Sequence, residues 1–213
     1  MSRLAHGPLP IAVCAVVWLA VAPACRRPTA SSTPPSAAAA PSQEIELDYQ
    51  LQLESPKGFR PFLEEDVFHT GDGFRLVLWS DFAAHVYLLD RSDGETAYHV
   101  FASGENGQPA ATVRNTRTTL PSTAGKCFRL DDRVGDEDLI LVASTAPVSE
   151  LAGPRTLPRD RADRVLADLL RCCQPPSLRR FVDLDWVKLI AAGRKEMAFV
   201  VRLPLRHDAR PRQ

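Results

Sequence analysis

Alternation of apolar and polar side chains in IELDYQLQL, residues 45–53, constrains the fold of this chain more than any other feature. Apolar residues occupy every second position, and polar residues fill the positions between them without a fault. Successive side chains of a β-strand point to opposite faces, so this period of two predicts a strand with one buried face.

Short apolar runs separated by turn-forming residues recur over the following hundred residues. Gly71-Asp72-Gly73 precedes one run and Ser92-Asp93-Gly94 follows the next, and such clusters mark turns. The further predicted strands are residues 74–79, 85–90, 98–102, 116–120, 126–130 and 138–144. Many short strands at regular spacing predict a mainly β fold, either an antiparallel β-sandwich or an open barrel.

The periodicity changes after Pro154. Apolar residues then recur at a spacing of three and four up to the pair Pro175-Pro176, which predicts one helix. Residues 181–192 are ambiguous, and we interpret them as a second short helix or a turn around Trp186. Residues 197–205 predict a final strand, and Pro204 indicates an edge position because proline donates no backbone hydrogen bond. The helical face consists of Ala162, Val165, Leu166, Leu169, Leu170 and Cys173.

The N-terminus has the organisation of an export signal. Residues 11–22 carry no charge and no proline, and this run is shorter than the ~20 residues of a membrane-spanning helix. The following segment, Val21-Ala22-Pro23-Ala24-Cys25, resembles the bacterial lipobox, in which the cysteine is acylated. Residue 26 is Arg and not Asp, which under the usual lipoprotein sorting rule of Gram-negative bacteria implies the outer membrane. Cleavage by ordinary signal peptidase after Ala24 and an uncleaved N-terminal anchor are the alternatives.

Composition divides the chain into five segments. Residues 1–24 are the expected signal peptide, and residues 25–43, rich in proline, alanine and serine, are the lipidated cysteine and a disordered tether. Residues 44–150 form the β-sandwich, residues 151–206 add a helix and a strand to the same domain, and residues 207–213 form a disordered tail.

Charge is distributed unevenly between the two folded segments. Residues 44–150 contain nine Lys/Arg and nineteen Asp/Glu, a net charge of −10, whereas residues 151–213 contain fourteen and seven, a net charge of +7. We expect the basic segment to pack on the acidic one. Contact with anionic lipid or with a cell-wall polymer is the alternative.

The segment GDGFRLVLWSDFAAHVYLLD, residues 71–90, resembles the opening of domain of unknown function 4384. Leu120-Pro121, the turn Gly135-Asp136-Glu137 and LILVASTAPVSEL also resemble its pattern, so the resemblance covers about residues 60–150. It implies a β-rich module outside the cytoplasm, and the family supplies no known catalytic residues.

Three cysteines follow the tether, and an exported chain exposes them to an oxidising compartment. A bridge from Cys127 to Cys172 or Cys173 would join the helix to the sheet, with Cys172 the better partner because Cys173 shares the apolar helix face. A bridge between Cys172 and Cys173, or three free thiols, are the alternatives, since spacing does not fix connectivity.

Trp79, Tyr87 and Trp186 are candidate binding residues, because aromatic rings can stack on sugar rings. Their alternative role is in the core, where buried aromatic residues dominate β-sandwiches.

Motifs for catalysis, metals and nucleic acids are missing from the sequence. The histidines His69, His85 and His99 are scattered, and residues 131–138 lack the order of a calcium loop, so we interpret the latter as a solvated turn. Ser103 lies near glycines at a predicted hairpin tip, without the nucleophile-elbow pattern. We therefore expect no cofactor, no metal and no nucleic-acid partner.

These features together predict a lipid-anchored envelope protein, tied to the membrane through Cys25, that recognises a protein or a cell-wall polymer without catalysis. A small cell-wall hydrolase and a structural subunit of an envelope or secretion complex are the alternative functions.

Overall fold

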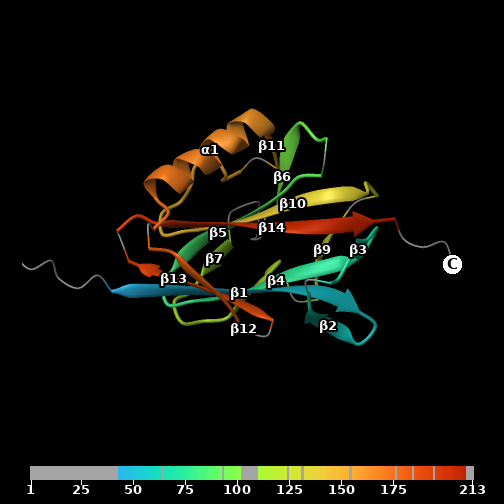
Figure 1. Cartoon of the computed structure of the whole chain (residues 1–213), viewed down its shortest axis with the longest axis horizontal. Coiled ribbons are helices and arrows are strands. Elements are labelled where there is room, and N and C mark those ends of the chain that lie inside the picture. The colour runs from blue at the N-terminus through green and yellow to red at the C-terminus, as the bar shows by residue number, and fades with distance from the viewer. Residues whose placement is uncertain are drawn as a thin grey trace, which may run out of the picture. The chain divides into compact units, whose positions relative to one another are not determined.

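Two β-sheets and one α-helix make up the part of the chain that the computed structural model describes (Figure 1). The predicted signal peptide, Cys25, the tether up to residue 42 and Ser103 lie outside it. The prediction of a mainly β fold with a C-terminal helix is confirmed, and the two open sheets form a sandwich rather than a closed barrel. The described residues are 43–63, 65–92, 94–101, 110–123, 125–130, 132–153, 155–175, 177–183, 185–193 and 195–209.

The first sheet, sheet A, is built around β1, which contains the alternating segment. Its strands follow the order β12-β13-β1-β4-β8, while β2 pairs with β1 and β9 pairs with β4, all antiparallel. Their bounds are Glu44–Ser55 for β1, Gly58–Pro61 for β2, Gly73–Ser80 for β4, Thr118–Leu120 for β8, Phe128–Arg129 for β9, Arg179–Asp183 for β12 and Trp186–Ala192 for β13.

The second sheet, sheet B, follows the order β11-β6-β5-β10-β14-β3, and β7 pairs with β5. All of its pairs are antiparallel except β14 with β3. Their bounds are Phe68–His69 for β3, Ala84–Asp90 for β5, Ala97–Phe101 for β6, Ala110–Thr112 for β7, Gly135–Ser144 for β10, Thr156–Pro158 for β11 and Ala198–Asp208 for β14.

The main core lies between the facing sides of the two sheets. Alternate residues of β1 point into it, and Leu47 and Tyr49 are almost completely buried there. Leu88 of β5, Leu141 of β10 and Phe199 of β14 reach it from sheet B. The apolar half of the alternating segment is therefore the side that covers sheet B, as its period of two predicts.

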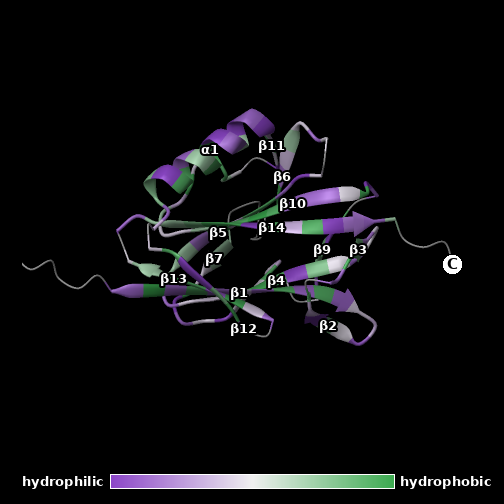
Figure 2. Cartoon of the chain, viewed as in Figure 1, coloured by the Kyte–Doolittle hydropathy of each residue, from purple (hydrophilic) through white to green (hydrophobic). Residues whose placement is uncertain are grey.

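Helix α1, Arg159–Cys172, packs on the other face of sheet B (Figure 1). Its residues Ala162, Leu166 and Leu169 are buried in a second apolar cluster with Ile140 and Val142 of β10. Figure 2 shows hydrophilic residues on the side of α1 that faces away from the sheet. Sheet B is thus covered on both faces, which explains why residues 139–144 of β10 are apolar almost without interruption.

The ambiguous segment 181–192 forms strands β12 and β13, so its interpretation as a short helix or turn around Trp186 is wrong. Val187, Leu189 and Ala191 alternate with polar or outward residues and pair with β1. The chain turns at Asp185, immediately before Trp186. The partner strand β1 lies about 140 positions earlier in the chain, which local spacing does not reveal, and pairing with it selects the extended conformation.

The last strand extends further than expected. β14 continues through Asp208, and His207, the first residue of the expected disordered tail, is completely buried. Only the two-residue strand β3 borders β14 on its outer side, at His207 and Asp208. Pro204 therefore lies where the outer side of β14 has no neighbouring strand within the described residues, as expected for an edge.

Candidate functional site

The candidate site is the face of sheet A that points away from sheet B, which we call the outer face of sheet A. The one helix in the described part of the chain packs on sheet B and leaves this face without a helical cover. Strand register places alternate residues of β1, β4 and β13 on it. They include Glu46, Asp48, Gln50 and Gln52 of β1, Arg75, Val77 and Trp79 of β4, and Trp186, Lys188 and Ile190 of β13.

Two tryptophans flank the central strand of this face. Trp79 of β4 lies opposite Asp48 of β1, and Trp186 begins β13 on the other side of β1. Both side chains are partly exposed. Since neighbouring strands lie about 4.8 Å apart, roughly 10 Å separates β4 from β13. The guanidinium of Arg117 lies 5.0 Å from the Trp186 ring centroid, which is the distance of a cation–π contact.

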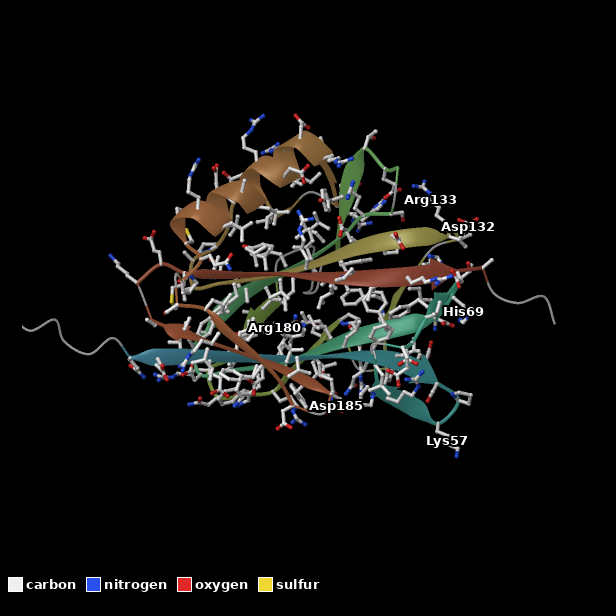
Figure 3. All side chains as sticks on the ribbon, in the orientation of Figure 1. Lys57, His69, Asp132, Arg133, Arg180 and Asp185 are labelled. Carbon is white, nitrogen blue, oxygen red and sulfur yellow. The ribbon has the colours of Figure 1, made fainter. Side chains whose placement is uncertain are left out.

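Amide side chains of β1 form a chain of hydrogen bonds on the same face. Gln50 is 4 % exposed, and its Nε2 donates to Asp185 Oδ2 at 2.7 Å. Gln52 Nε2 donates to Gln50 Oε1, and Arg75 Nε donates to Gln52 Oε1 at 2.6 Å. Asp185, labelled in Figure 3, lies in the turn between β12 and β13. These bonds fix the orientation of several planar polar groups on one surface.

Carboxyl groups occupy the other half of the same strand. Lys188 Nζ lies 2.6 Å from Glu46 Oε1 and 4.0 Å from Asp48 Oδ2. Burial raises the pKa of Asp48 to about 6, and the nearby Glu46 carboxylate adds to the rise while Lys188 opposes it. Asp48 Oδ1 is buried and accepts no hydrogen bond from the described residues. The face therefore combines aromatic rings with donors, acceptors and one carboxyl that titrates near neutral pH.

Trp79 and Trp186 share this face, but Tyr87 does not. Tyr87 is 1 % exposed and lies in the apolar cluster between sheet B and α1. Its hydroxyl accepts a hydrogen bond from the backbone N–H of Val148 at 2.8 Å. The prediction of Tyr87 as a binding residue is therefore wrong, because α1 covers the face on which it lies.

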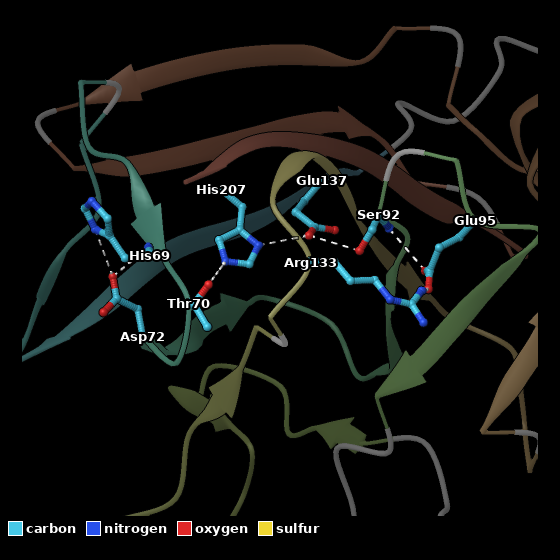
Figure 4. A network of polar contacts seen from close by, with 8 residues as sticks. All are labelled: His69, Thr70, Asp72, Ser92, Glu95, Arg133, Glu137 and His207. Atoms are coloured by element: carbon cyan, nitrogen blue, oxygen red, sulfur yellow. Dashed lines mark hydrogen bonds and ion pairs between the residues drawn. The ribbon is translucent and has the colours of Figure 1, made fainter. Parts of the chain in front are cut away.

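A second polar group lies inside the fold, at the end of β14 (Figure 4). His207 Nδ1 is 3.3 Å from Glu137 Oε1, and His207 Nε2 is 3.3 Å from Thr70 Oγ1. The hydroxyl of Ser92 donates to the same Glu137 oxygen at 3.0 Å. The sequence suggested a solvated turn for residues 131–138, yet Glu137 is 3 % exposed. This group joins β14, β10 and the connections after β3 and β5.

Three further contacts lie beside this group, towards the surface. The backbone N–H of Ser92 donates to Glu95 Oε2 at 3.3 Å, and Arg133 forms an ion pair with Glu95. On the other side, His69 Nδ1 lies 3.6 Å from Asp72 Oδ2 (Figure 4). Sequence reasoning missed the whole arrangement, since its members are separated by up to 137 positions.

The order hydroxyl, imidazole, carboxylate in Thr70, His207 and Glu137 is the order found in hydrolytic triads. The side chains of His207 and Glu137 are 0 % and 1 % exposed, so a substrate does not reach the imidazole in this conformation. We therefore interpret the group as a structural connection between strands.

All three described cysteines are free thiols. Cys127 lies beside β9 of sheet A, with its Sγ 3.8 Å from Glu54 Oε2, whereas Cys172 and Cys173 end the helix on the far side of sheet B. Sheet B separates the two positions, and packed layers lie about 10 Å apart. The prediction of a bridge from Cys127 to Cys172 or Cys173 is therefore wrong for this fold, because a disulfide needs Cα atoms within about 7 Å.

Metal ligands do not gather in the described part of the chain, where no group of three or more His, Cys, Asp or Glu side chains could hold an ion. His69 lies beside Asp72, and His99 lies 3.7 Å from Glu95. No helix in this part is both long and apolar enough to span a bilayer.

Comparison with known proteins adds no relative. A scan against protein-family models, a search of curated proteins and a search of solved structures each gave no match. The resemblance to domain of unknown function 4384 stays a prediction.

Proposed function

We propose that this chain is a lipid-anchored recognition protein of the bacterial envelope, and that the outer face of sheet A binds a cell-wall polysaccharide. The observation that carries the proposal is the pair Trp79 and Trp186 on either side of a strand with oriented amide and carboxyl groups. Sugar rings present an apolar face for stacking and a rim of hydroxyls for hydrogen bonds. Aromatic rings next to polar planar groups complement both features.

Binding of the purified full chain to insoluble peptidoglycan tests this proposal. We expect Trp79→Ala and Trp186→Ala each to weaken binding by about tenfold, which corresponds to ~1.4 kcal/mol and to the effect of losing an aromatic contact. Leu170→Ala is the matched control, because Leu170 is a 45 % exposed apolar residue on α1, away from this face. Equal binding by all four proteins, or no binding by the wild type, would overturn the proposal.

The anchor rests on Cys25, which follows an apolar run and precedes a proline-rich segment. Several acyl chains on one residue hold a protein stably at a bilayer, whereas a single chain does not. Cells fed a clickable palmitate should label the wild-type chain and should not label Cys25→Ser. Absence of label in both proteins would overturn the lipid anchor.

A structural subunit of an envelope complex is the second candidate function, and strand β12 favours it. β12 forms one edge of sheet A, and its Phe181 and Val182 are 48 % and 65 % exposed. An open edge can add a strand from another chain. If this edge is the functional surface, Val182→Pro removes a partner from envelope pull-downs, whereas Trp79→Ala leaves that partner bound.

A further inference from the structure

Strand β14 leaves most of its outer edge without a neighbouring strand. β10 pairs with its inner side from Ala198 to His207, whereas β3 reaches only His207 and Asp208 on the outer side. At the other end, the N–H of Ala198 donates to the Cys173 carbonyl at 3.1 Å. No described strand borders the outer side of residues 199–206, which we call the β14 edge.

The register of β14 on β10 shows which backbone groups face outward. The N–H of Asp138 donates to the Arg91 carbonyl at 2.9 Å, on the side of β10 that faces away from β14. Its register partner Pro204 therefore directs its own backbone groups away from β10, as does every second residue of β14. The outward N–H groups that lack a partner among the described residues are those of Val200, Arg202 and Arg206. Such a row of donors and acceptors fits the backbone of one more strand.

Two basic side chains lie four positions apart on one face of the β14 edge. Arg202 and Arg206 have side chains that are 60 % and 70 % exposed. Arg202 lies 3.7 Å from Asp138, but that carboxylate is also bonded to Arg91 at 2.8 Å. Arg206 lies 3.3 Å from Asp208, at the end of the strand. The exposed arginines attract acidic side chains on an added strand and repel the same edge of a second copy.

The opposite face of the β14 edge continues the main core, against which Leu203 packs. Because β4 leads into β5 and β13 leads into β14, the β12 side of sheet A and the β14 side of sheet B lie on the same open side of the sandwich (Figure 1). Val182 of β12 pairs with Val187, which packs against the main core, yet Val182 is 65 % exposed. Sheet B thus ends before it covers β12, and apolar residues of an added strand fit this place.

We propose that the β14 edge binds an extended acidic segment of a protein partner as one more strand of sheet B. The outward backbone groups select a polypeptide, and the two arginines select acidic side chains four positions apart. Leu203 and Val182 select apolar side chains between them. Charged residues and proline on an edge keep two copies of a chain apart, so the partner is a different protein. This surface is separate from the outer face of sheet A and does not depend on the proposed polysaccharide site.

Two peptides of matched pattern and opposite charge test the site. Capped TEVTVET and TKVTVKT are titrated into the isotope-labelled full chain, and binding is followed by nuclear magnetic resonance. We expect TEVTVET to bind about tenfold more tightly than TKVTVKT, since opposite charges on neighbouring strands attract and like charges repel. Arg202→Glu and Arg206→Glu should each lose most of this preference. Arg114→Glu, the matched control, should keep it, because Arg114 is exposed in the turn after β7, on the other side of the sandwich.

Amide hydrogen exchange distinguishes an added strand from a contact between charged side chains alone. In the free chain, the outward N–H groups of Val200 and Arg206 should exchange faster than those of Val201 and Leu203, which face β10. TEVTVET should slow the exchange at Val200 and Arg206 and leave Val201 and Leu203 unchanged.

A pair of substitutions at Arg202 separates the backbone donor from the charge. Arg202→Ala removes the charge alone, whereas Arg202→Pro also removes an outward N–H, at a place equivalent to Pro204. We expect the proline variant to bind TEVTVET more weakly than the alanine variant, with an unchanged circular dichroism spectrum as evidence that the fold is kept.

Equal affinity of the wild type for both peptides would overturn the proposal. Binding that leaves the exchange of the Val200 and Arg206 N–H groups unchanged would also overturn it, as would a dimer that Arg202→Pro dissociates. A wild-type chain that binds phosphatidylglycerol vesicles and neither peptide would overturn it as well, because the anionic ligand would then be a lipid surface.

Discussion

At the scale of single residues, the pair His207 and Glu137 is the least expected feature of this protein. Both side chains are essentially inaccessible to solvent, and His207 lies between Glu137 Oε1 and the hydroxyl of Thr70. The hydroxyl of Ser92 donates to the same Glu137 oxygen, while the buried Glu137 Oε2 has no hydrogen-bond partner among the described residues. Polar groups that are buried in this way are costly when one partner is removed, because the other is left without a hydrogen bond.

Glu137→Ala should lower the free energy of unfolding by about 3 kcal/mol, since it leaves the His207 imidazole buried without its carboxylate partner. Urea denaturation of Glu137→Ala, His207→Ala and the double variant measures the coupling. We expect the double variant to lose at least ~1 kcal/mol less than the sum of the single losses. Strictly additive losses would show that the two side chains do not stabilise each other.

Asp48 gives a pH dependence at the same scale. Its pKa in the fold, about 6, exceeds its usual value of 3.8 because of burial and the Glu46 carboxylate, so the folded state binds the proton more tightly than the unfolded state. Its contribution to stability is therefore complete below pH 4 and is lost as the pH rises through 6.

Asp48→Asn removes this pH-dependent loss. We expect the variant to match the wild type at pH 4 and to be more stable by ~1–2 kcal/mol at pH 7, a value reduced for partial exposure. Melting temperatures across this range measure the difference. A stabilisation of equal size at both pH values would contradict the raised pKa of Asp48.

At the scale of elements, helix α1 depends on its buried side. Leu166 is 3 % exposed and packs against sheet B, so Leu166→Ala leaves a cavity and should cost about 2–5 kcal/mol. Leu170, 45 % exposed on the same helix, is the control, and its replacement by Ala should change stability by less than ~0.5 kcal/mol. Urea denaturation compares the two variants, and similar losses would contradict the assignment of the buried face.

Elements with a strong internal period were predictable, and elements defined by their neighbours were not. The alternation in β1 and the three-and-four spacing in α1 each depend on one segment, and both elements are confirmed. Leu170, which was expected on the apolar face of the helix, is instead 45 % exposed. β12 and β13 were missed because residues 181–192 show no clean period of two, and because β1, the partner of β13, lies far away in the sequence. The short strands β2, β3, β7 and β11 are two to four residues long, too short to show a period.

At the scale of the whole molecule, layering decides which cysteines meet. Sheet B separates Cys127 from Cys172 and Cys173, so export to an oxidising compartment should not join them. A digest of the native protein without reduction should contain Cys127 as an alkylated free thiol. A peptide that joins Cys127 to Cys172 or Cys173 would contradict this layer order.

Layering also decides which aromatic residues are accessible. Trp79, Tyr87 and Trp186 were equivalent as sequence candidates, and the position of α1 separates them by covering only the face that carries Tyr87. The ion pair of Glu46 with Lys188, 142 positions apart, completes the outer face of sheet A. No local pattern contains that contact.

The sequence by itself determined the class of fold and the main strands. Apolar residues recur at every second position in a strand and at a spacing of three and four in a helix. Both patterns depend only on neighbouring residues and on which side of the element is buried. The tertiary structure alone decided the register of β13 on β1, the face that α1 covers and the burial of His207 with Glu137. These depend on contacts between segments far apart in the chain, and their free energy comes from packing and hydrogen bonds that exist only when the layers are assembled.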